Sequence, residues 1–191
     1  MDKGEIAVFL DRDGTLIEDA KYLKRVEDIK IIDGTPESIK KLNDNNVLAF
    51  LVTNQSGVAR GYFSEDDVTI INNALSDVLK AKDAYLDGYY YCPHHTKGTV
   101  KEYSCDCDCR KPKSGMINQA LNIFKEINLK KSYVIGDKAI DIELAKNAGC
   151  KGILVKTGYG AQVADENNIE ADYIAENIND AVNWVLENLK D

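Results

Sequence analysis

The chain has 191 residues, of which 44% are hydrophobic and 29% are charged, and its formal net charge at pH 7 is −8. This composition is typical of one folded globular domain and excludes a disordered chain. An acidic protein lacks the basic surface that non-specific binding to nucleic acid or anionic membrane requires, so we expect neither partner. The sequence shows no signal peptide and no run of about 18 apolar residues, which predicts a cytoplasmic location.

Short apolar runs alternate along the chain with segments of helical periodicity. The runs expected to form strands are residues 6–10, 47–52, 86–91, 132–135, 152–155 and 171–175. Helices are expected to begin at residues that cap helices well, namely Thr35 followed by Pro36, Ser64, Ser114 and Asn179. A further helix covers residues 139–148 and ends at Gly149.

This alternation predicts a three-layer, Rossmann-like α/β fold, in which a parallel sheet carries helices on both faces. Residues 16–46 hold one loop and one helix and leave no room for a large cap domain. We therefore expect a single domain over residues 1–191. No long heptad pattern indicates a partner helix, so a monomer is expected.

Polar residues follow three of the apolar runs. They are Asp11 and Asp13 after the first run, Thr53 and Asn54 after the second, and Asp137 and Lys138 after the fourth. Each pair alone is also common in turns and helix caps. Because ligands of parallel sheets bind at the carboxyl ends of the strands, however, these side chains are expected to converge on one site.

The two aspartates of the first group suit phosphoryl transfer. A carboxylate such as Asp11 can attack phosphorus if a divalent cation reduces the repulsion between two negative groups. Mg²⁺ prefers oxygen ligands, which Asp11 and Asp137 can supply. Asp13 can protonate the leaving alkoxide and then deprotonate the attacking water. Lys111 and Lys138 are candidates to match the negative charge of the phosphate.

Four ordered motifs resemble those of the haloacid dehalogenase-like (HAD-like) phosphatases. They are residues 9–16 (FLDRDGTL), 53–57 (TNQSG), 110–112 (RKP) and 136–141 (GDKAID). The resemblance extends from about residue 6 to residue 160 and implies that Asp11 is the nucleophile and Asp13 the general acid/base. It also implies that Thr53 and Lys111 bind the phosphate, and that Asp11, Asp137 and the backbone carbonyl of Asp13 ligate Mg²⁺.

The segment from residue 92 to about 109 has no periodicity but contains four of the five cysteines. Its Cys-x-His and Cys-x-Cys patterns offer the ligands of a tetrahedral zinc site, which would be structural and would hold the loop. Free thiols or a disulfide formed on oxidation are the alternative. Cys105, Cys107 and Cys109 are three candidates for two of the ligand positions.

This loop resembles more narrowly the D-glycero-D-manno-heptose 1,7-bisphosphate 7-phosphatase family. The resemblance rests on residues 53–63 (TNQSGVARGYF), 92–95 (CPHH) and 107–112 (CDCRKP). It implies hydrolysis of the 7-phosphate of a small phosphorylated sugar through an aspartyl-phosphate intermediate. It also implies four zinc ligands, which are Cys92, His94, Cys107 and Cys109. Cys105 is then an extra thiol, and His95 a neighbour of the site.

A bisphosphate carries a second phosphate, for which Arg110 is a good candidate because arginine makes bidentate phosphate contacts. Arg60 and Lys113 are weaker candidates that are equally explained as surface cations. Two other functions stay open. Histidinol-phosphate phosphatases share the four motifs but typically have a shorter zinc loop. A catalytically silent zinc-containing binding protein is disfavoured by the complete set of acidic and lysine motif residues.

Overall fold

The computed structural model describes residues 4–166 and 169–189. Its strands form one parallel sheet in the order β3-β2-β1-β4-β5-β6. They are β1 (Ala7–Leu10), β2 (Leu48–Asn54), β3 (Gly88–Cys92), β4 (Tyr133–Gly136), β5 (Lys151–Val155) and β6 (Tyr173–Ala175). The predicted parallel α/β sheet is confirmed, with strand boundaries shifted by one or two residues.

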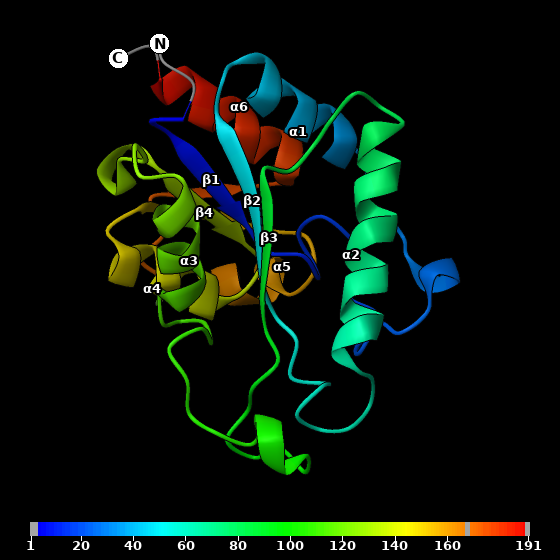
Figure 1. Ribbon diagram of the computed structural model, residues 1–191. Helices are drawn as coiled ribbons and strands as arrows, with labels where there is room; N and C mark the ends of the chain where they lie inside the picture. Colours follow the sequence, from blue (N-terminus) through cyan, green and yellow to red (C-terminus); the bar gives the residue numbers. More distant parts are fainter. Residues whose placement is uncertain (1–3, 167–168, 190–191) are drawn as a thin grey trace.

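Helices cover both faces of the sheet (Figure 1). One face carries α1 (Thr35–Asp44), α2 (Glu65–Lys80) and α6 (Ile178–Asn188), and the other carries α3 (Gly115–Ile123) and α4 (Ala139–Ala148). In β1, Val8 and Leu10 pack into the first layer, whereas Ala7 and Phe9 pack into the second. Because β1 is buried on both faces, its sequence is continuously apolar rather than alternating.

Two predicted N-cap residues, Thr35 and Asn179, do not cap their helices because their side chains have other partners. Gly34, with a left-handed φ of 81°, occupies the N-cap position of α1, and the Thr35 hydroxyl instead donates to the carbonyl of Leu16. Asn177 caps α6, whereas the Asn179 side chain accepts a hydrogen bond from a lysine of α1. Tertiary contacts thus decide between capping residues that are close together in sequence.

The other helix boundaries agree better with the prediction. Ser64 caps α2 through a capping box with Asp67, and Gly149 ends α4 with a φ of 77°. Ser114 occupies the N-cap position of α3, but its side chain makes no capping hydrogen bond. The short helix α5 (Gly160–Asp165) was not predicted, because six residues are too few for a periodic pattern.

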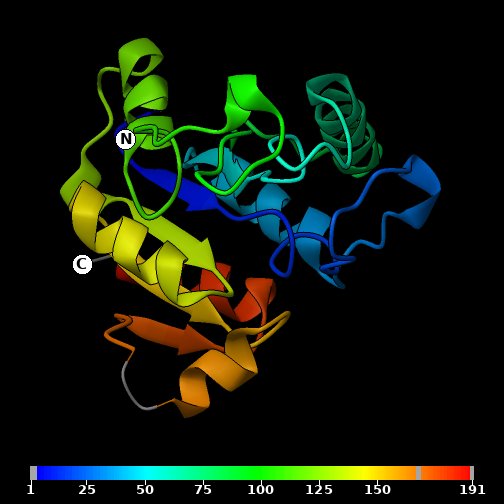
Figure 2. The same ribbon diagram turned by 90° about the horizontal axis from the view of Figure 1, so that it is seen from below.

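Loops gather at the carboxyl ends of the strands. Figure 1 shows the segments after β2 and β3 extending beyond that edge of the sheet, and Figure 2 shows the same edge from below. Between β1 and α1 the chain forms only the short 3-10 helix η1 (Val26–Asp28), so no large cap domain is inserted there. In the part of the chain that the structure describes, no helix could span a membrane.

Candidate active site

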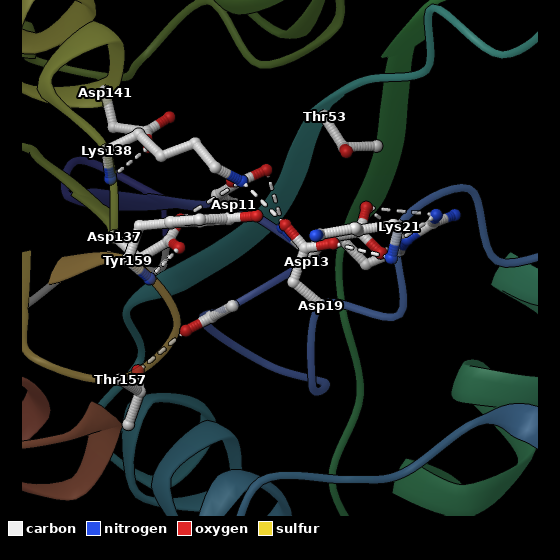
Figure 3. Close-up of polar contacts among 12 residues, drawn as sticks. Asp11, Asp13, Asp19, Lys21, Thr53, Asp137, Lys138, Asp141, Thr157 and Tyr159 are labelled. Atoms are coloured by element: carbon white, nitrogen blue, oxygen red, sulfur yellow. Dashed lines mark hydrogen bonds and ion pairs between the residues drawn. The ribbon is translucent and has the colours of Figure 1, made fainter.

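Asp11 lies at the carboxyl end of β1, in the middle of the sheet. Its backbone N–H donates to the carbonyl of Ile135 in β4 over 2.9 Å, which extends the sheet by one residue. The side chain is 4% exposed, and its Oδ1 lies 2.8 Å from Lys111 Nζ. Asp11 and Asp13 are central in Figure 3, between Asp137 on one side and Thr53 on the other. The predicted convergence of strand-end residues is therefore observed.

Lys111 is a buried cation held between two carboxylates. Its Nζ lies 2.8 Å from Asp11 Oδ1 and 2.7 Å from Asp141 Oδ1. Burial alone would lower the pKa of Lys111, but these two charges raise it above its usual value. Asn54 brackets the lysine backbone, because its Oδ1 accepts the Lys111 N–H over 3.0 Å and its Nδ2 donates to the Lys111 carbonyl over 3.2 Å. The Asn54 amide thus holds the backbone of Lys111 in place. Asn54 also lines the cavity at this site.

Asp137 has one carboxylate oxygen that accepts a hydrogen bond and one that contacts only a cation, since Oδ1 lies 3.6 Å from Lys138 Nζ. Oδ2 accepts the backbone N–H of Tyr159 over 2.9 Å, while the buried Oδ1 has no hydrogen-bond partner among the described residues. Burial raises the pKa of Asp137 to about 7, and the charge of Asp11 adds to the effect. Gly14 and Gly158 have positive φ, and a Cβ on either would lie 2.2 Å from Oδ2. Only glycine allows the backbone to enclose this carboxylate so closely.

Three buried carboxylates could therefore hold a cation. Oxygen atoms of Asp11, Asp137 and Asp141 lie within 4.8 Å of one another. Asp141 is the most committed of the three, because its Oδ1 accepts from Lys111 and its Oδ2 accepts the Lys138 N–H over 3.1 Å. Oδ1 of Asp137 is the best placed for a metal, because it accepts no hydrogen bond from the described residues and a buried polar atom without one is unfavourable.

Asp13 is held by two side chains that the sequence does not single out. The fully buried Arg12 donates from Nη2 to Asp13 Oδ1 and from Nε to Asp13 Oδ2, each over 3.2 Å. Gln55 Nε2 also donates to Asp13 Oδ2, over 2.9 Å. A third guanidinium nitrogen, Arg12 Nη1, donates to Asn72 of α2 over 3.1 Å. Asp13 is thereby fixed to a neighbouring helix as well as to the loop after β2.

A small cavity unites the predicted catalytic and phosphate-binding residues. Its volume is about 180 Å³, and its walls include Asp11, Asp13, Thr53, Arg110, Lys111 and Lys138. Arg60 does not line it. Instead, Arg60 Nη2 lies 3.4 Å from His95 Nε2, in the loop that contains the cysteines. The structure therefore brings together the predicted phosphate-binding residues except the two weaker candidates, Arg60 and Lys113, of which Lys113 Nζ instead binds Asp106.

The four predicted zinc ligands form a compact cluster. Cys107 Sγ lies 3.5 Å from Cys92 Sγ and 3.3 Å from Cys109 Sγ, and His94 Nδ1 lies 3.4 Å from Cys109 Sγ. Zinc–sulfur bonds of about 2.3 Å in a tetrahedron separate two sulfurs by roughly 3.8 Å, close to these distances. A hydrogen bond from Cys92 and another from His94 lower the pKa of Cys109 to about 5, which favours the thiolate that metals bind. Cys105 is exposed and lies outside the cluster.

This cluster is connected directly to the small cavity. Arg110 follows the last cysteine, and its Nη1 donates to the backbone carbonyl of His94 over 3.1 Å. At the other side of the loop, the hydroxyl groups of Tyr91 and Tyr103 donate to Glu65 at the start of α2, over 2.6 and 2.8 Å. Tyr103 therefore ties the loop to the start of α2, where Tyr91 of β3 donates to the same carboxylate.

Comparison with known proteins places this site in a family. A family model described as HAD-hydrolase-like matches residues 108–181. A D-glycero-D-manno-heptose-1,7-bisphosphate 7-phosphatase of Thermosynechococcus vestitus is 41% identical over 190 residues, which cover 96% of each chain. The chain belongs to this family of HAD-like phosphatases. A Haemophilus influenzae relative, whose name specifies the beta form of the sugar, is 44% identical over 96% of this chain and 98% of its own.

The fold comparison agrees with membership of this family. A crystal structure of D,D-heptose 1,7-bisphosphate phosphatase from B. bronchiseptica, complexed with magnesium and phosphate, matches with a TM-score of 0.85. That protein is 27% identical, and the match covers 95% of this chain and 98% of the other. As a member of the HAD-like phosphatases, the protein is a phosphoric monoester hydrolase that acts on a small phosphorylated sugar.

Several residues that contribute to this site were not predicted from the sequence. Thr157 Oγ1 donates to the Gly14 carbonyl over 2.7 Å, and Tyr159 N–H donates to Asp137. Asp19 Oδ2 accepts from Lys138 Nζ over 3.1 Å. The sequence signal that could have found Thr157 and Tyr159 is the polar segment 156–158 (KTG) after β5, because the carboxyl ends of neighbouring parallel strands share one edge.

Proposed function

We propose that this chain hydrolyses the 7-phosphate of D-glycero-D-manno-heptose 1,7-bisphosphate, with Asp11 as nucleophile and Asp13 as general acid/base. The observation that carries the proposal is the placement of Asp11, in contact with the buried Lys111 in a cavity that Asp13 and Thr53 also line. Full-length relatives named for this activity support the choice of substrate. The beta anomer is the proposed form, because the name of the Haemophilus influenzae relative specifies it.

The proposed reaction has two steps at the same phosphorus atom. In the first, an Asp11 oxygen bonds to phosphorus while the bond to the sugar oxygen breaks, and the carboxylic acid of Asp13 gives its proton to that oxygen. In the second, a water oxygen bonds to phosphorus while the Asp11–phosphorus bond breaks, and the Asp13 carboxylate takes a proton from that water. Thr53 and Lys111 would bind the oxygens of the transferring group, with Lys138 adding a second positive charge.

Asp11, Asp137 and the backbone carbonyl of Asp13 would hold Mg²⁺. Oδ1 of Asp137 accepts no hydrogen bond from the described residues, and this oxygen and the glycine enclosure of the carboxylate fit a small cation with oxygen ligands. When bound, the ion supplies the positive charge that lets a carboxylate approach a phosphate dianion.

Residues 92–109 would form a zinc-binding loop within a single phosphatase domain. Cys92, His94, Cys107 and Cys109 are the proposed ligands of a structural zinc, because four filled positions leave none for substrate. The zinc would hold the loop that carries Arg110 into the small cavity. Arg110 is proposed to bind the second phosphate of the substrate.

Phosphate release from a panel of substrates tests this proposal. The panel contains both anomers of the heptose bisphosphate, histidinol phosphate, simple sugar monophosphates and p-nitrophenyl phosphate. We expect Mg²⁺-dependent turnover with the highest kcat/KM for the beta bisphosphate, and a preference for histidinol phosphate would replace the proposed substrate. Asp11→Asn should abolish turnover with an unchanged thermal unfolding curve. Activity retained by that variant would refute the role of Asp11.

A further inference from the structure

The cysteine loop (residues 92–109) is held in its middle by contacts that do not involve the proposed zinc ligands. Those four ligands lie at the two ends of the loop, so the stretch between them needs other partners. The carbonyl of Ala59 accepts both backbone N–H groups of residues 99–100, over 2.7 and 2.9 Å. Farther along the loop, the hydroxyl of Tyr103 donates to Glu65 Oε1 over 2.8 Å. The second contact leads to the active site.

The peptide group between His94 and His95 joins Tyr103 to Arg110. Its N–H, which belongs to His95, donates to the carbonyl of Tyr103 over 3.1 Å. Its C=O, which belongs to His94, accepts from Arg110 Nη1 over 3.1 Å. A peptide group is planar and rigid, so a rotation that loses one of these hydrogen bonds also misdirects the other. The direction of the Arg110 guanidinium therefore depends on where the Tyr103 backbone lies.

Tyr103 is itself fixed through its side chain. It ends η2 (Lys101–Tyr103), the short 3-10 helix at the lower edge of Figure 1. Its ring lies beside that of His94, with centroids 6.0 Å apart and an interplanar angle of 45°. The hydrogen bond to Glu65 raises the pKa of Tyr103, so the hydroxyl stays a donor at neutral pH. The same ring packs against a small hydrophobic cluster of Val58, Phe63 and Val68.

Glu65 connects this tyrosine to the rigid part of the molecule. It is the first residue of α2, where the helix dipole favours a carboxylate. Its Oε2 accepts the hydroxyl of Tyr91 over 2.6 Å, and Tyr91 lies in β3 opposite Thr53 of β2. Burial and the Glu65 contact raise the pKa of Tyr91 to about 12, so this hydroxyl also remains a donor. Glu65 is thus held by both a helix and the sheet, and it fixes Tyr103 relative to them.

We propose that Glu65 and Tyr103 are positioning residues that direct Arg110 toward the second phosphate of the substrate. Neither residue lines the small cavity, so both act through the His94–His95 peptide group. The inference rests on the proposed binding of the second phosphate by Arg110. It makes the preference for a bisphosphate depend on a carboxylate at the start of α2, outside the active site.

Two tyrosine variants form a matched test. Tyr103→Phe and Tyr91→Phe each remove one hydroxyl that donates to the same carboxylate, but only Tyr103 is linked to Arg110. Both variants are assayed with the heptose bisphosphate, its 7-monophosphate and p-nitrophenyl phosphate. Tyr103→Phe should raise KM for the bisphosphate about three- to tenfold, the effect of one hydrogen bond, without changing kcat. The other two substrates should be unaffected. An equal rise of KM in both variants, or an equal loss on all three substrates, overturns the positioning role.

Variants of the carboxylate and of Arg110 test the same route from its two ends. Glu65→Leu should reproduce the KM effect of Tyr103→Phe, and Glu65→Gln, which keeps an oxygen acceptor, should restore most of it. Asp66→Leu removes an exposed acid from the same turn of α2 and controls for the charge at the helix start. In an Arg110→Met background, Tyr103→Phe should cause no further rise in KM, because both changes affect one contact. Additive effects would contradict the route.

Two measurements without substrate separate this inference from the function on which it rests. Metal analysis should find the same zinc content in Tyr103→Phe as in wild type, and loss of zinc would overturn positioning because the whole loop would then have opened. The Nε–Hε NMR signal of Arg110, assigned with Arg110→Lys, should shift in Tyr103→Phe but not in Tyr91→Phe. An unchanged signal overturns the inference while the proposed function stands. A shifted signal in a protein that shows no preference for bisphosphates overturns the proposed substrate, while the positioning of Arg110 stands.

Discussion

Replacing Gly158 with alanine tests whether close packing of backbone around Asp137 prepares the metal site. Gly158 has a φ of 56°, and an added Cβ would lie 2.2 Å from Asp137 Oδ2 and 2.7 Å from the Cα of Gly14. Asp137 cannot simply move away, because the Tyr159 N–H holds the same oxygen. Gly149→Ala is the control, since Gly149 has a φ of 77° and nothing lies within 4 Å of a Cβ built there.

The two substitutions share one free-energy term and differ in another. A left-handed alanine costs about 1–2 kcal/mol relative to glycine, and both variants should lose this stability. Overpacking of a buried site adds about 1–3 kcal/mol, and only Gly158→Ala should lose this part as well. The expected loss is therefore about 2–5 kcal/mol for Gly158→Ala, which still leaves many domains folded.

Urea unfolding with and without Mg²⁺, combined with turnover measured over a Mg²⁺ titration, checks this prediction. Gly149→Ala should retain the wild-type kcat and the wild-type Mg²⁺ concentration for half-maximal activity. Gly158→Ala should need an at least tenfold higher Mg²⁺ concentration than wild type for half-maximal activity. Displacement of Asp137 should weaken Mg²⁺ binding about as much as the loss of one contact that supports a metal ligand. If both variants show the same Mg²⁺ dependence, the glycine enclosure has no role in metal binding.

Three further predictions concern the metal sites and Asp13. The pKa of Asp137 is raised from 3.8 to about 7, so the metal-free protein should lose stability from this group as pH rises across that interval. Added Mg²⁺ needs the carboxylate and should therefore raise Tm more at pH 8 than at pH 5.5; equal shifts would contradict the assignment. Cys107→Ser should lose about one equivalent of zinc per chain, while Cys105→Ser keeps it in metal analysis. Asn72→Leu removes the acceptor of Arg12 and should lower kcat for sugar phosphates about tenfold, but much less for p-nitrophenyl phosphate, whose leaving group needs no acid. Asn72→Asp keeps an acceptor and should stay near wild type, and equal losses in both Asn72 variants would argue against this contact.

The fold could be predicted where burial leaves a clear pattern in the sequence. Residues 7–10 form a central strand that is buried on both faces and paired on both edges, so the apolar run at residues 6–10 predicts β1 almost completely. Thr35 and Asn179 were wrong as capping residues because contacts with distant residues engage their side chains. Such contacts leave no pattern in the local sequence, whereas burial of a strand leaves a run of apolar residues.

The same distinction applies to the site. Asp11 and Asp137 could be predicted because each directly follows a buried strand, and parallel strands place their carboxyl ends together. The partners of Asp13 could not be predicted in this way. Arg12 can be identified as a partner of Asp13 only when the packing of α2, which places Asn72 beside Arg12, is known. The backbone N–H of Tyr159 reaches Asp137 from a turn that follows another strand. These contacts depend on how separate elements pack.

The bracket that Asn54 forms around Lys111 has a consequence for the order of folding. The two residues are 57 positions apart in sequence, so their hydrogen bonds close a long loop that includes α2, β3 and the cysteine segment. Contacts of such long range form late, after the local elements are present. During folding, Asp11 would therefore be in place in the site well before Lys111 is held beside it. Competence for phosphate chemistry should consequently appear only after this loop has closed, so recovery of activity reports folding beyond the local elements.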